Sequence, residues 1–172
     1  MNRWVKLAVI AVAAVAVGQL LFRSAEPAMG SGTPAPPLAL PDLQGRRVDL
    51  AALKGKVVAV NFWASWCGPC QLEIPELAQV WSAHRDRCFE LLGVAEESAP
   101  SDLMRLAPSI PYPILFDARA EALTPWRVEG YPRTYLVDAE GKVRRVFVGA
   151  LRKRQLEEAI GPLLPASCPA RS

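Results

Sequence analysis

Two cysteines, Cys67 and Cys70, stand three positions apart where an apolar run gives way to a helical pattern. A cysteine at the N-terminus of a helix faces unpaired backbone N–H groups and the positive end of the helix dipole, so the pKa of its thiol falls. A second thiol three residues later can attack a mixed disulfide made by the first and release the bound partner. The spacing therefore predicts dithiol-disulfide exchange, with Cys67 as the nucleophile and Cys70 as the resolving thiol. This chemistry needs neither a metal nor an organic cofactor.

A pair of cysteines at this spacing is also found as half of a zinc site. Structural zinc takes four ligands, commonly two such pairs or one pair with two histidines. The remaining thiols, Cys88 and Cys168, stand far apart, and His84 is the single histidine of the chain. We therefore expect no metal at the pair. A pair without chemistry is the other alternative, and the strand before it and the helix after it argue against that alternative.

The elements that must position the pair are a strand on one side and a helix on the other. Residues 57–63 are almost continuously apolar, which predicts a central strand covered on both faces. Apolar residues at helical spacing after the pair predict a helix that runs to about Arg85, with a kink at Pro75. Pro69 suits the first turn of that helix, where its missing N–H costs nothing.

The other elements complete an α/β domain. A strand, a helix and a strand come first and a hairpin comes last, which predicts a mixed sheet with helices on both faces. The expected elements are a leading hairpin over 38–50, strands over 88–95 and 114–116, helices over 101–106 and 117–126, hairpin strands over 133–137 and 142–148, and a closing helix over 152–164.

The first residues carry the features of an export signal. Arg3 and Lys6 precede an apolar run over 7–22, which indicates a signal sequence or a signal anchor. The run is slightly short for a membrane span, but the residues after it offer no convincing small-x-small cleavage site. We therefore expect an uncleaved anchor over 1–23. The basic residues before it predict a single-pass protein of a bacterial inner membrane with the remainder in the periplasm.

Composition sets the remaining limits. A chain of 172 residues with 51% hydrophobic content is long enough for one packed domain and an appendage. Prolines and glycines make residues 24–33 a flexible linker, so we expect the folded domain over 34–172. The formal net charge is +3, and no basic run with interleaved aromatic residues is present, so nucleic-acid binding has no support.

The two distant cysteines leave two possibilities open. A disulfide between Cys88 and Cys168 would close a loop of about 80 residues and stabilise the domain mainly by restricting the unfolded chain. The alternative is a buried Cys88 and a free, exposed Cys168. The sequence does not choose between them.

Taken together, these patterns resemble the thioredoxin-like fold and, more narrowly, the TlpA/ResA branch of thiol-disulfide oxidoreductases, over residues 34–164. The resemblance implies a three-layer α/β/α sandwich with a mixed central sheet and an N-terminal β-hairpin extension. The matching residues are Asn61-Phe62-Trp63-Ala64-Ser65-Trp66-Cys67-Gly68-Pro69-Cys70, then Glu73, Pro75 and Leu77, then Val128-Glu129-Gly130-Tyr131-Pro132-Arg133-Thr134-Tyr135-Leu136-Val137-Asp138 with Gly141.

The resemblance implies two further catalytic residues. It implies that the bond before Pro132 is cis and that this proline lies against the cysteine pair; an ordinary turn proline is the alternative. It also implies a functional glutamate at Glu73, which lies on the same side of its helix as Cys70 and can take the proton of that thiol. A solvated glutamate is the alternative for Glu73. Asn61 stands where thioredoxin has a buried aspartate.

The resemblance also implies a surface that contacts the partner. We expect the backbone of Tyr131 to pair with an extended partner segment. Tyr131 and Arg133 depart from the commonest family pattern, which has a small or β-branched residue before the cis proline and threonine after it. The expected substrate-binding residues are Trp66, Gly68, Pro69, Tyr131 and Arg133.

The activity that the resemblance implies is the reduction of disulfides in exported proteins. The expected substrates are apocytochrome c or a copper-delivery protein, with a membrane thiol-electron donor returning the electrons. An oxidant that donates its disulfide is one alternative, because the sequence does not set the reduction potential. A metal-binding chaperone module with Cys67 and Cys70 as soft ligands is another, and the absence of a nearby histidine or methionine cluster argues against it.

Overall fold

The computed structural model describes residues 31–168 of the chain. They form a six-stranded sheet with the strand order β1-β8-β7-β4-β5-β6 and a separate two-stranded sheet of β2 and β3. The strands are β1 (Thr33–Pro34), β2 (Ala39–Pro41), β3 (Arg47–Asp49), β4 (Val57–Trp63), β5 (Phe89–Ala95), β6 (Ile114–Phe116), β7 (Arg133–Val137) and β8 (Lys142–Val148). The helices are η1 (Leu50–Leu53), α2 (Gly68–His84), α3 (Pro100–Leu106), η2 (Ala107–Ser109), α4 (Leu123–Trp126), α5 (Lys153–Ile160) and η3 (Gly161–Leu163).

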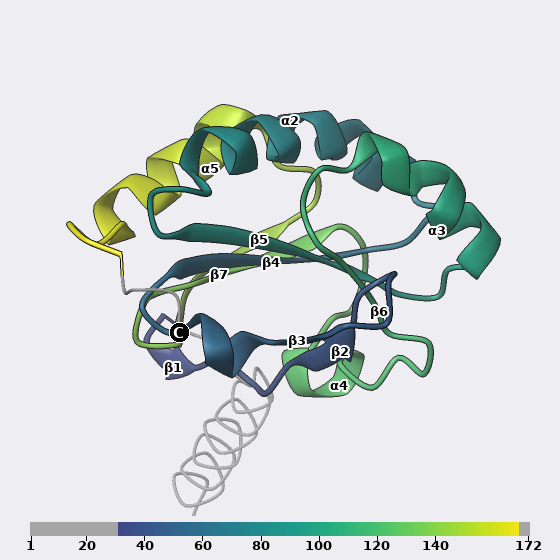
Figure 1. Cartoon of the computed structure of the whole chain (residues 1–172), viewed down its shortest axis with the longest axis horizontal. Coiled ribbons are helices and arrows are strands. Elements are labelled where there is room, and N and C mark those ends of the chain that lie inside the picture. The colour runs from purple at the N-terminus through teal and green to yellow at the C-terminus, as the bar shows by residue number, and fades with distance from the viewer. Residues whose placement is uncertain (1–30, 169–172) are drawn as a thin grey trace, which may run out of the picture.

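The sheet is mixed, as the sequence predicts. β4 pairs in parallel with β5, and β5 with β6, whereas β7 pairs antiparallel with both β4 and β8. Helices α2, α3 and α5 lie over one face of the sheet, and α4 with the β2–β3 hairpin lies on the other side (Figure 1). This arrangement confirms the predicted α/β sandwich with a mixed central sheet.

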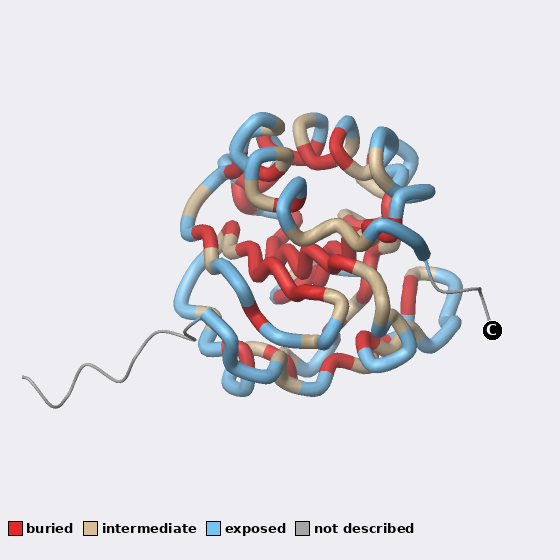
Figure 2. The backbone as a smooth tube through the Cα atoms, turned by 90° about the vertical axis from the view of Figure 1, so that its left-hand side faces the viewer, coloured by how far each residue is buried: buried red, intermediate tan, exposed pale blue. Residues whose placement is uncertain are grey.

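The core has two parts, one on each face of the sheet. All seven residues of β4 are buried, and their side chains alternate between the two parts. Val57, Ala59 and Trp63 pack toward α2 and α5, whereas Val58, Val60 and Phe62 pack toward β2 and α4. Figure 2 shows the buried backbone concentrated in the central strands. A strand buried on both faces gives the cysteine pair a rigid base.

Two segments differ from the sequence-based expectation. β1 is a short edge strand that pairs with β8, and the sequence does not reveal it. The helix expected over 117–126 is shorter, because α4 covers only its last four residues. The carboxylate of Asp117 accepts the N–H of Ala122 at 2.7 Å, and Ala120 has a left-handed φ of 54°. An aspartate that bonds the nearby backbone in this way competes with helix formation.

The structure settles the alternatives for the two distant cysteines. Cys88 and Cys168 form a disulfide, with 80 positions of sequence between them and a Cα–Cα distance of 5.1 Å. Cys88 is buried at the turn after α2, and Cys168 is exposed in the tail after η3. The bond therefore joins the last described residues to the start of β5.

Replacing both Cys88 and Cys168 by serine should lower the free energy of unfolding by about 2 to 4 kcal/mol, because the unfolded chain then regains the freedom of a long loop. The measurement is urea unfolding of the oxidised chain at equilibrium. The double replacement avoids a leftover free thiol, and disulfide exchange at the other cysteine pair should persist in it. An unchanged unfolding midpoint would contradict a stabilising role for this bond.

The predicted membrane location has to be corrected. Between residues 31 and 168, no helix combines the length and the apolar character needed to cross a bilayer. The prediction of a single-pass protein of a bacterial inner membrane with a periplasmic domain is therefore wrong by this finding. The segment to which the anchor was assigned, residues 1–23, lies outside the described residues, as does most of the predicted linker over 24–33. The domain boundary at residue 34 stays a prediction.

Candidate functional site

The cysteine pair lies at the start of α2, directly after the central strand. Cys67 is the N-cap residue of the helix, and the N–H of Cys70 donates to its sulfur at 3.2 Å. The two cysteines form a disulfide with a Cα–Cα distance of 5.2 Å. Cys67 is 5% exposed and Cys70 is fully buried. Cys67 is thus the cysteine of the pair that keeps a small exposed fraction, and Cys70 keeps none.

Glu73 is buried one turn of α2 beyond Cys70, on the same side of the helix. The side-chain amide of Asn61 donates to Oε1 at 2.8 Å, and the backbone N–H of Leu151 donates to Oε2 at 2.7 Å. Burial raises the pKa of Glu73 to about 7, although both hydrogen bonds oppose the shift. The alternative of a solvated glutamate is therefore wrong, and the carboxyl group can change protonation near neutral pH.

Asn61 holds this carboxyl group in place. Its amide nitrogen also donates to the hydroxyl of Thr134 at 2.9 Å, so β4, α2 and β7 meet in one buried network. Thr134 lies directly opposite Asn61 in the antiparallel register of β4 and β7. The register of the sheet thus fixes the orientation of the glutamate.

The bond between Tyr131 and Pro132 is cis, which confirms the expectation and rules out an ordinary trans turn proline. The register pairs Arg133 with Phe62, so Pro132 comes opposite the end of β4, where the loop to the cysteines begins. The carbonyl of Pro132 accepts the N–H of Gly149 at 2.9 Å. Tyr131 directly precedes this proline and is partly exposed.

The exposed surface beside the pair is aromatic. Trp66 is 63% exposed, and its ring meets that of Tyr131 edge-on with 5.9 Å between the ring centres. The indole N–H of Trp66 donates to the carbonyl of Glu97 at 3.0 Å. Gly68 and Pro69 are also exposed at the start of α2. Four of the five expected substrate-binding residues thus border Cys67 or lie beside Trp66.

Arg133 is placed differently from the other four. Its side chain is 13% exposed, its guanidinium lies 5.9 Å from the ring centre of Tyr135, and it approaches the Glu129 carboxylate at 3.7 Å. Tyr135 in turn donates its hydroxyl to the carbonyl of Trp126. Arg133 therefore packs beneath the segment that leads to the cis proline, and its contact with a partner stays a prediction.

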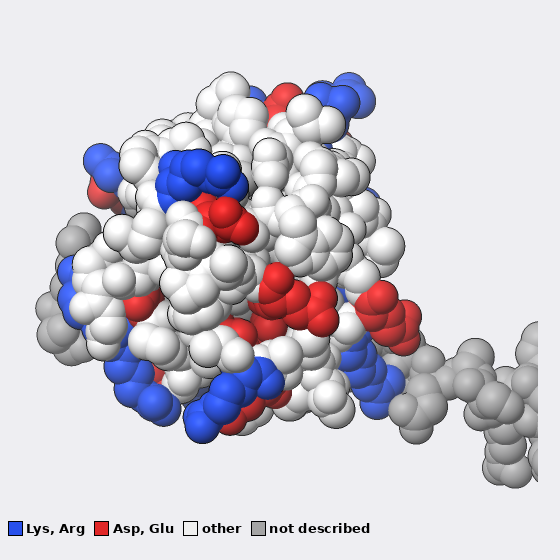
Figure 3. Space-filling model, turned by 90° about the vertical axis from the view of Figure 1, so that its right-hand side faces the viewer, with Lys and Arg blue, Asp and Glu red and all other residues white. Residues whose placement is uncertain are grey.

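Two carboxyl groups near this site were not singled out from the sequence. Glu96 and Asp117 directly follow β5 and β6, and both are buried. The signal in the sequence was an acidic residue immediately after each of two apolar strands, since the carboxyl ends of neighbouring parallel strands meet at one edge of a sheet. Figure 3 shows the face at which β4, β5 and β6 end, with acidic side chains near its middle, and the buried Glu96 and Asp117 lie beneath the surface of the molecule.

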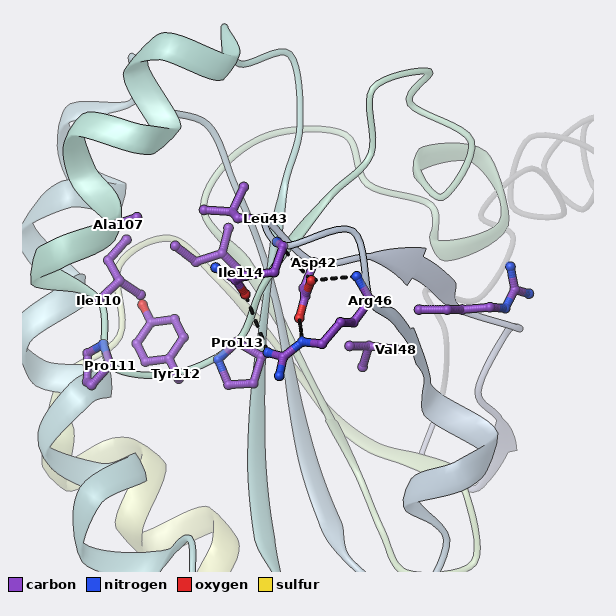
Figure 4. A pocket seen from close by; sticks show the side chains of 12 residues that line it. Asp42, Leu43, Arg46, Val48, Ala107, Ile110, Pro111, Tyr112, Pro113 and Ile114 are labelled. Atoms are coloured by element: carbon purple, nitrogen blue, oxygen red, sulfur yellow. Dashed lines mark hydrogen bonds and ion pairs between the residues drawn. The ribbon is translucent and has the colours of Figure 1, made fainter.

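A pocket of about 490 Å³ lies elsewhere, between the β2–β3 hairpin and the segment before β6. Figure 4 shows apolar side chains such as Ile110 and Pro113 on its wall, with Asp42 and Arg46 joined to each other. None of the cysteines lines it. Within residues 31–168, no group of three or more His, Cys, Asp or Glu side chains is placed to hold a metal ion.

A buried strand, a cysteine pair at the N-terminus of the following helix and a cis proline opposite the strand end together define a thioredoxin-like thiol-disulfide oxidoreductase. Comparison with known proteins agrees. Residues 31–146 match the AhpC/TSA family, and the chain belongs to that family.

The relatives that match most of this chain are named as thiol-disulfide oxidoreductases. The chain is 29% identical over 146 residues to the thiol-disulfide oxidoreductase ResA of Geobacillus thermodenitrificans, covering 84% of each protein. It is 26% identical to ResA of Bacillus subtilis, covering 94% of this chain and 93% of that one. A crystal structure of a thioredoxin-family thiol:disulfide interchange protein from Chlorobium tepidum is 30% identical, with a TM-score of 0.72 over 79% of this chain and 99% of that one. The chain is a thiol-disulfide oxidoreductase of this type.

Proposed function

We propose that this oxidoreductase reduces disulfides of exported proteins by exchange at Cys67 and Cys70. The observation that carries the proposal is the contrast between the two sulfurs. Cys67 keeps 5% exposure, whereas Cys70 is fully buried one helical turn from a buried carboxyl group with a pKa of about 7. Bulk water cannot take a proton from the fully buried thiol of Cys70, so a neighbouring base such as Glu73 is needed for the resolving step.

The proposed cycle transfers two electrons to the partner. The thiolate of Cys67 attacks one sulfur of the partner disulfide, a Cys67–partner bond forms, and the second partner sulfur leaves as a thiolate. The thiol of Cys70 then gives its proton to Glu73 and attacks the sulfur of Cys67. The Cys67–Cys70 disulfide forms, and the remaining partner sulfur leaves as a thiolate. An external dithiol must reduce the enzyme disulfide again, and we propose a membrane thiol-electron donor for that step.

The proposed substrates are cysteine pairs of apocytochrome c or of a copper-delivery protein. The ring pair of Trp66 and Tyr131 offers an apolar surface beside Cys67. An extended partner segment would pair with the backbone of Tyr131 next to Pro132. The exposed Gly68 and Pro69 would leave room for the partner disulfide beside Cys67. In this proposal Arg133 acts on the partner through the segment that it supports.

The opposite direction has one observation in its favour. The Cys70 N–H donates to the sulfur of Cys67, and the start of α2 faces the same atom. Both contacts stabilise a Cys67 thiolate, and stabilising the reduced form makes a disulfide more oxidising. A periplasm-type oxidant that donates its disulfide is therefore the second candidate.

A glutathione redox titration separates the two directions. We expect the Cys67–Cys70 pair of the chain to have a reduction potential at or below about −220 mV, on the thioredoxin side of the range for such pairs. The readout is the mass of the peptide that contains both cysteines after thiol trapping, which excludes any signal from Cys88 and Cys168. A potential near roughly −120 mV would identify an oxidant and would reject the proposed direction.

A further inference from the structure

Glu96 is a buried carboxyl group that the proposed exchange does not use. Its side chain has no solvent exposure, and no N–H or hydroxyl donor among the described residues reaches either of its oxygens. A buried carboxylate without donors is strongly unfavourable. The group that faces it is the carboxyl of Asp117, which is itself buried at the end of the neighbouring parallel strand.

Two carboxyl groups can be joined by a hydrogen bond only if one of them carries a proton. Asp117 already has a fixed role as an acceptor, because its Oδ2 receives the N–H of Ala122 at 2.7 Å. Its backbone N–H donates to the carbonyl of Ala95 at 3.1 Å, which holds it next to Glu96. The donor-free Glu96 is therefore the member of the pair that has to be the acid.

The backbone around Glu96 is joined to the loop that carries Cys67. The N–H of Glu96 donates to the carbonyl of Trp63 at 2.9 Å, and its carbonyl accepts the hydroxyl of Ser98 at 2.8 Å. The Ser98 oxygen also accepts the N–H of Ser65 at 2.8 Å. The segment after β5 thus forms hydrogen bonds to Trp63 and Ser65, shortly before Cys67.

The carboxyl pair also lies near Tyr131 of the cis-proline segment. Burial raises the pKa of the Tyr131 hydroxyl, and the charges of Glu97, Glu96 and Asp117 raise it further. For Glu96 itself, burial comes first among the causes that raise the pKa to about 8, followed by Asp117 and then Glu97. The titratable groups that act on Glu96 are therefore Asp117, which follows β6, and Glu97 from its own segment, and Glu96 in turn acts on Tyr131 from the segment before β7.

We propose that Glu96 is a positioning residue that shares one proton with Asp117. The shared proton holds the loop of residues 64–67, which includes Trp66, and the Tyr131–Pro132 segment in the arrangement that a protein partner binds. Loss of the proton places two like charges in a buried site, and they relax only if the ends of β5 and β6 move apart. That movement carries Ser98 and the Glu97 carbonyl with it, and these two groups hold Ser65 and Trp66. The partner-binding surface is then disturbed while both cysteines stay in place.

The inference rests on the proposed function, because it assumes that Trp66 and Tyr131 contact a protein substrate. The test compares the rates at which the reduced full chain is oxidised by insulin and by glutathione disulfide. Both reactions need the same Cys67 thiolate, so the ratio of their rate constants cancels the titration of that thiol. The ratio reports the partner-binding surface.

We expect the ratio for the unchanged chain to fall about tenfold between pH 7 and pH 9, because the neutral fraction of a group with a pKa of about 8 falls about tenfold over that range. Glu96→Gln, which keeps a donor toward Asp117 and cannot ionise, should keep the ratio constant. Glu97→Gln is the matched control, an exposed glutamate one position later, and it should keep the fall. Titration of insulin itself is common to all variants.

A Glu96→Gln chain that still shows the fall, or a Glu97→Gln chain that loses it, would overturn the inference. If Glu96→Gln does not fold, Asp117→Asn provides the second variant. This substitution removes the like charge, and the new amide group can donate a hydrogen bond to Glu96. The fall should then disappear, and its persistence would overturn the inference. If the ratio of the insulin rate constant to the glutathione disulfide rate constant in the unchanged chain is above one and constant with pH, only the role of Glu96 is rejected. A ratio near one at every pH rejects the proposed protein substrate.

Discussion

Replacing Cys70 by serine should leave Cys67 joined to partner proteins in mixed disulfides that persist, and multiple-turnover exchange should be lost. The first attack needs only the sulfur of Cys67, the cysteine of the pair that keeps some solvent exposure. Release needs a thiolate from the buried position three residues later, and a serine hydroxyl does not ionise enough to supply it. The measurement is mass spectrometry of the chain after acid quenching and alkylation, in the presence of a protein disulfide.

The matched control is Cys67→Ser, which keeps the buried thiol and should form no mixed disulfide. Covalent complexes that depend on Cys70 in this control would reverse the assigned roles. A metal carrier would behave differently in both variants, because it would lose metal affinity without trapping a partner. The pair of variants therefore distinguishes redox exchange from metal binding.

Much of the fold could be predicted because the central elements have strong local patterns. The run over β4 is apolar at every position except Asn61, and a strand buried on both faces needs that pattern. α2 follows from the spacing of its apolar residues and from Pro69 in its first turn. β1 could not be predicted, because two exposed residues at a sheet edge become a strand only by pairing with β8. The short α4 depends on one side-chain contact of Asp117.

The candidate site divides in the same way. Cys67, Cys70, Glu73 and Pro132 could be identified because motif and helix spacing are properties of neighbouring residues. The pairing of Glu96 with Asp117 depends on the parallel register of β5 and β6, which brings together residues 21 positions apart. The partly buried position of Arg133 depends on its place on the face of β7 that also carries Tyr135, which packs with Trp126 of α4. A residue next to a motif on the chain therefore need not face the same partner.

Replacing Glu73 by glutamine should slow release from the mixed disulfide by about 10² to 10⁴-fold, the usual contribution of a positioned base. In the unchanged chain, the rate of the resolving step should rise as pH increases through about 7, because only the ionised carboxylate can accept the proton of Cys70. Glutamine has no such transition, so the step near pH 7 should vanish. Stopped-flow measurement of product release from a preformed mixed disulfide gives both quantities.

The same titration must appear in the stability of the protein, and its sign follows from the direction of the shift. Burial raises the pKa of Glu73 from 4.5 to about 7, so the folded state holds the proton more tightly than the unfolded state. The contribution of Glu73 to the free energy of unfolding is fully present below pH 4.5 and is lost as pH rises through 7. The contribution that is lost corresponds to roughly 3 kcal/mol. Glu73→Gln should lack this loss, although its amide cannot accept from both Asn61 and Leu151.

Glu76→Gln is the matched control for both measurements. Glu76 lies on the same helix and accepts the N–H of Lys153 at 3.0 Å, much as Glu73 accepts that of Leu151. It lies partly exposed beside α5, without the amide partner that Glu73 has, so its replacement should leave the step near pH 7 in place. If Glu73→Gln lost stability and kept the step in the resolving rate, the carboxyl would be a structural group. The proton of Cys70 would then have to leave by another route.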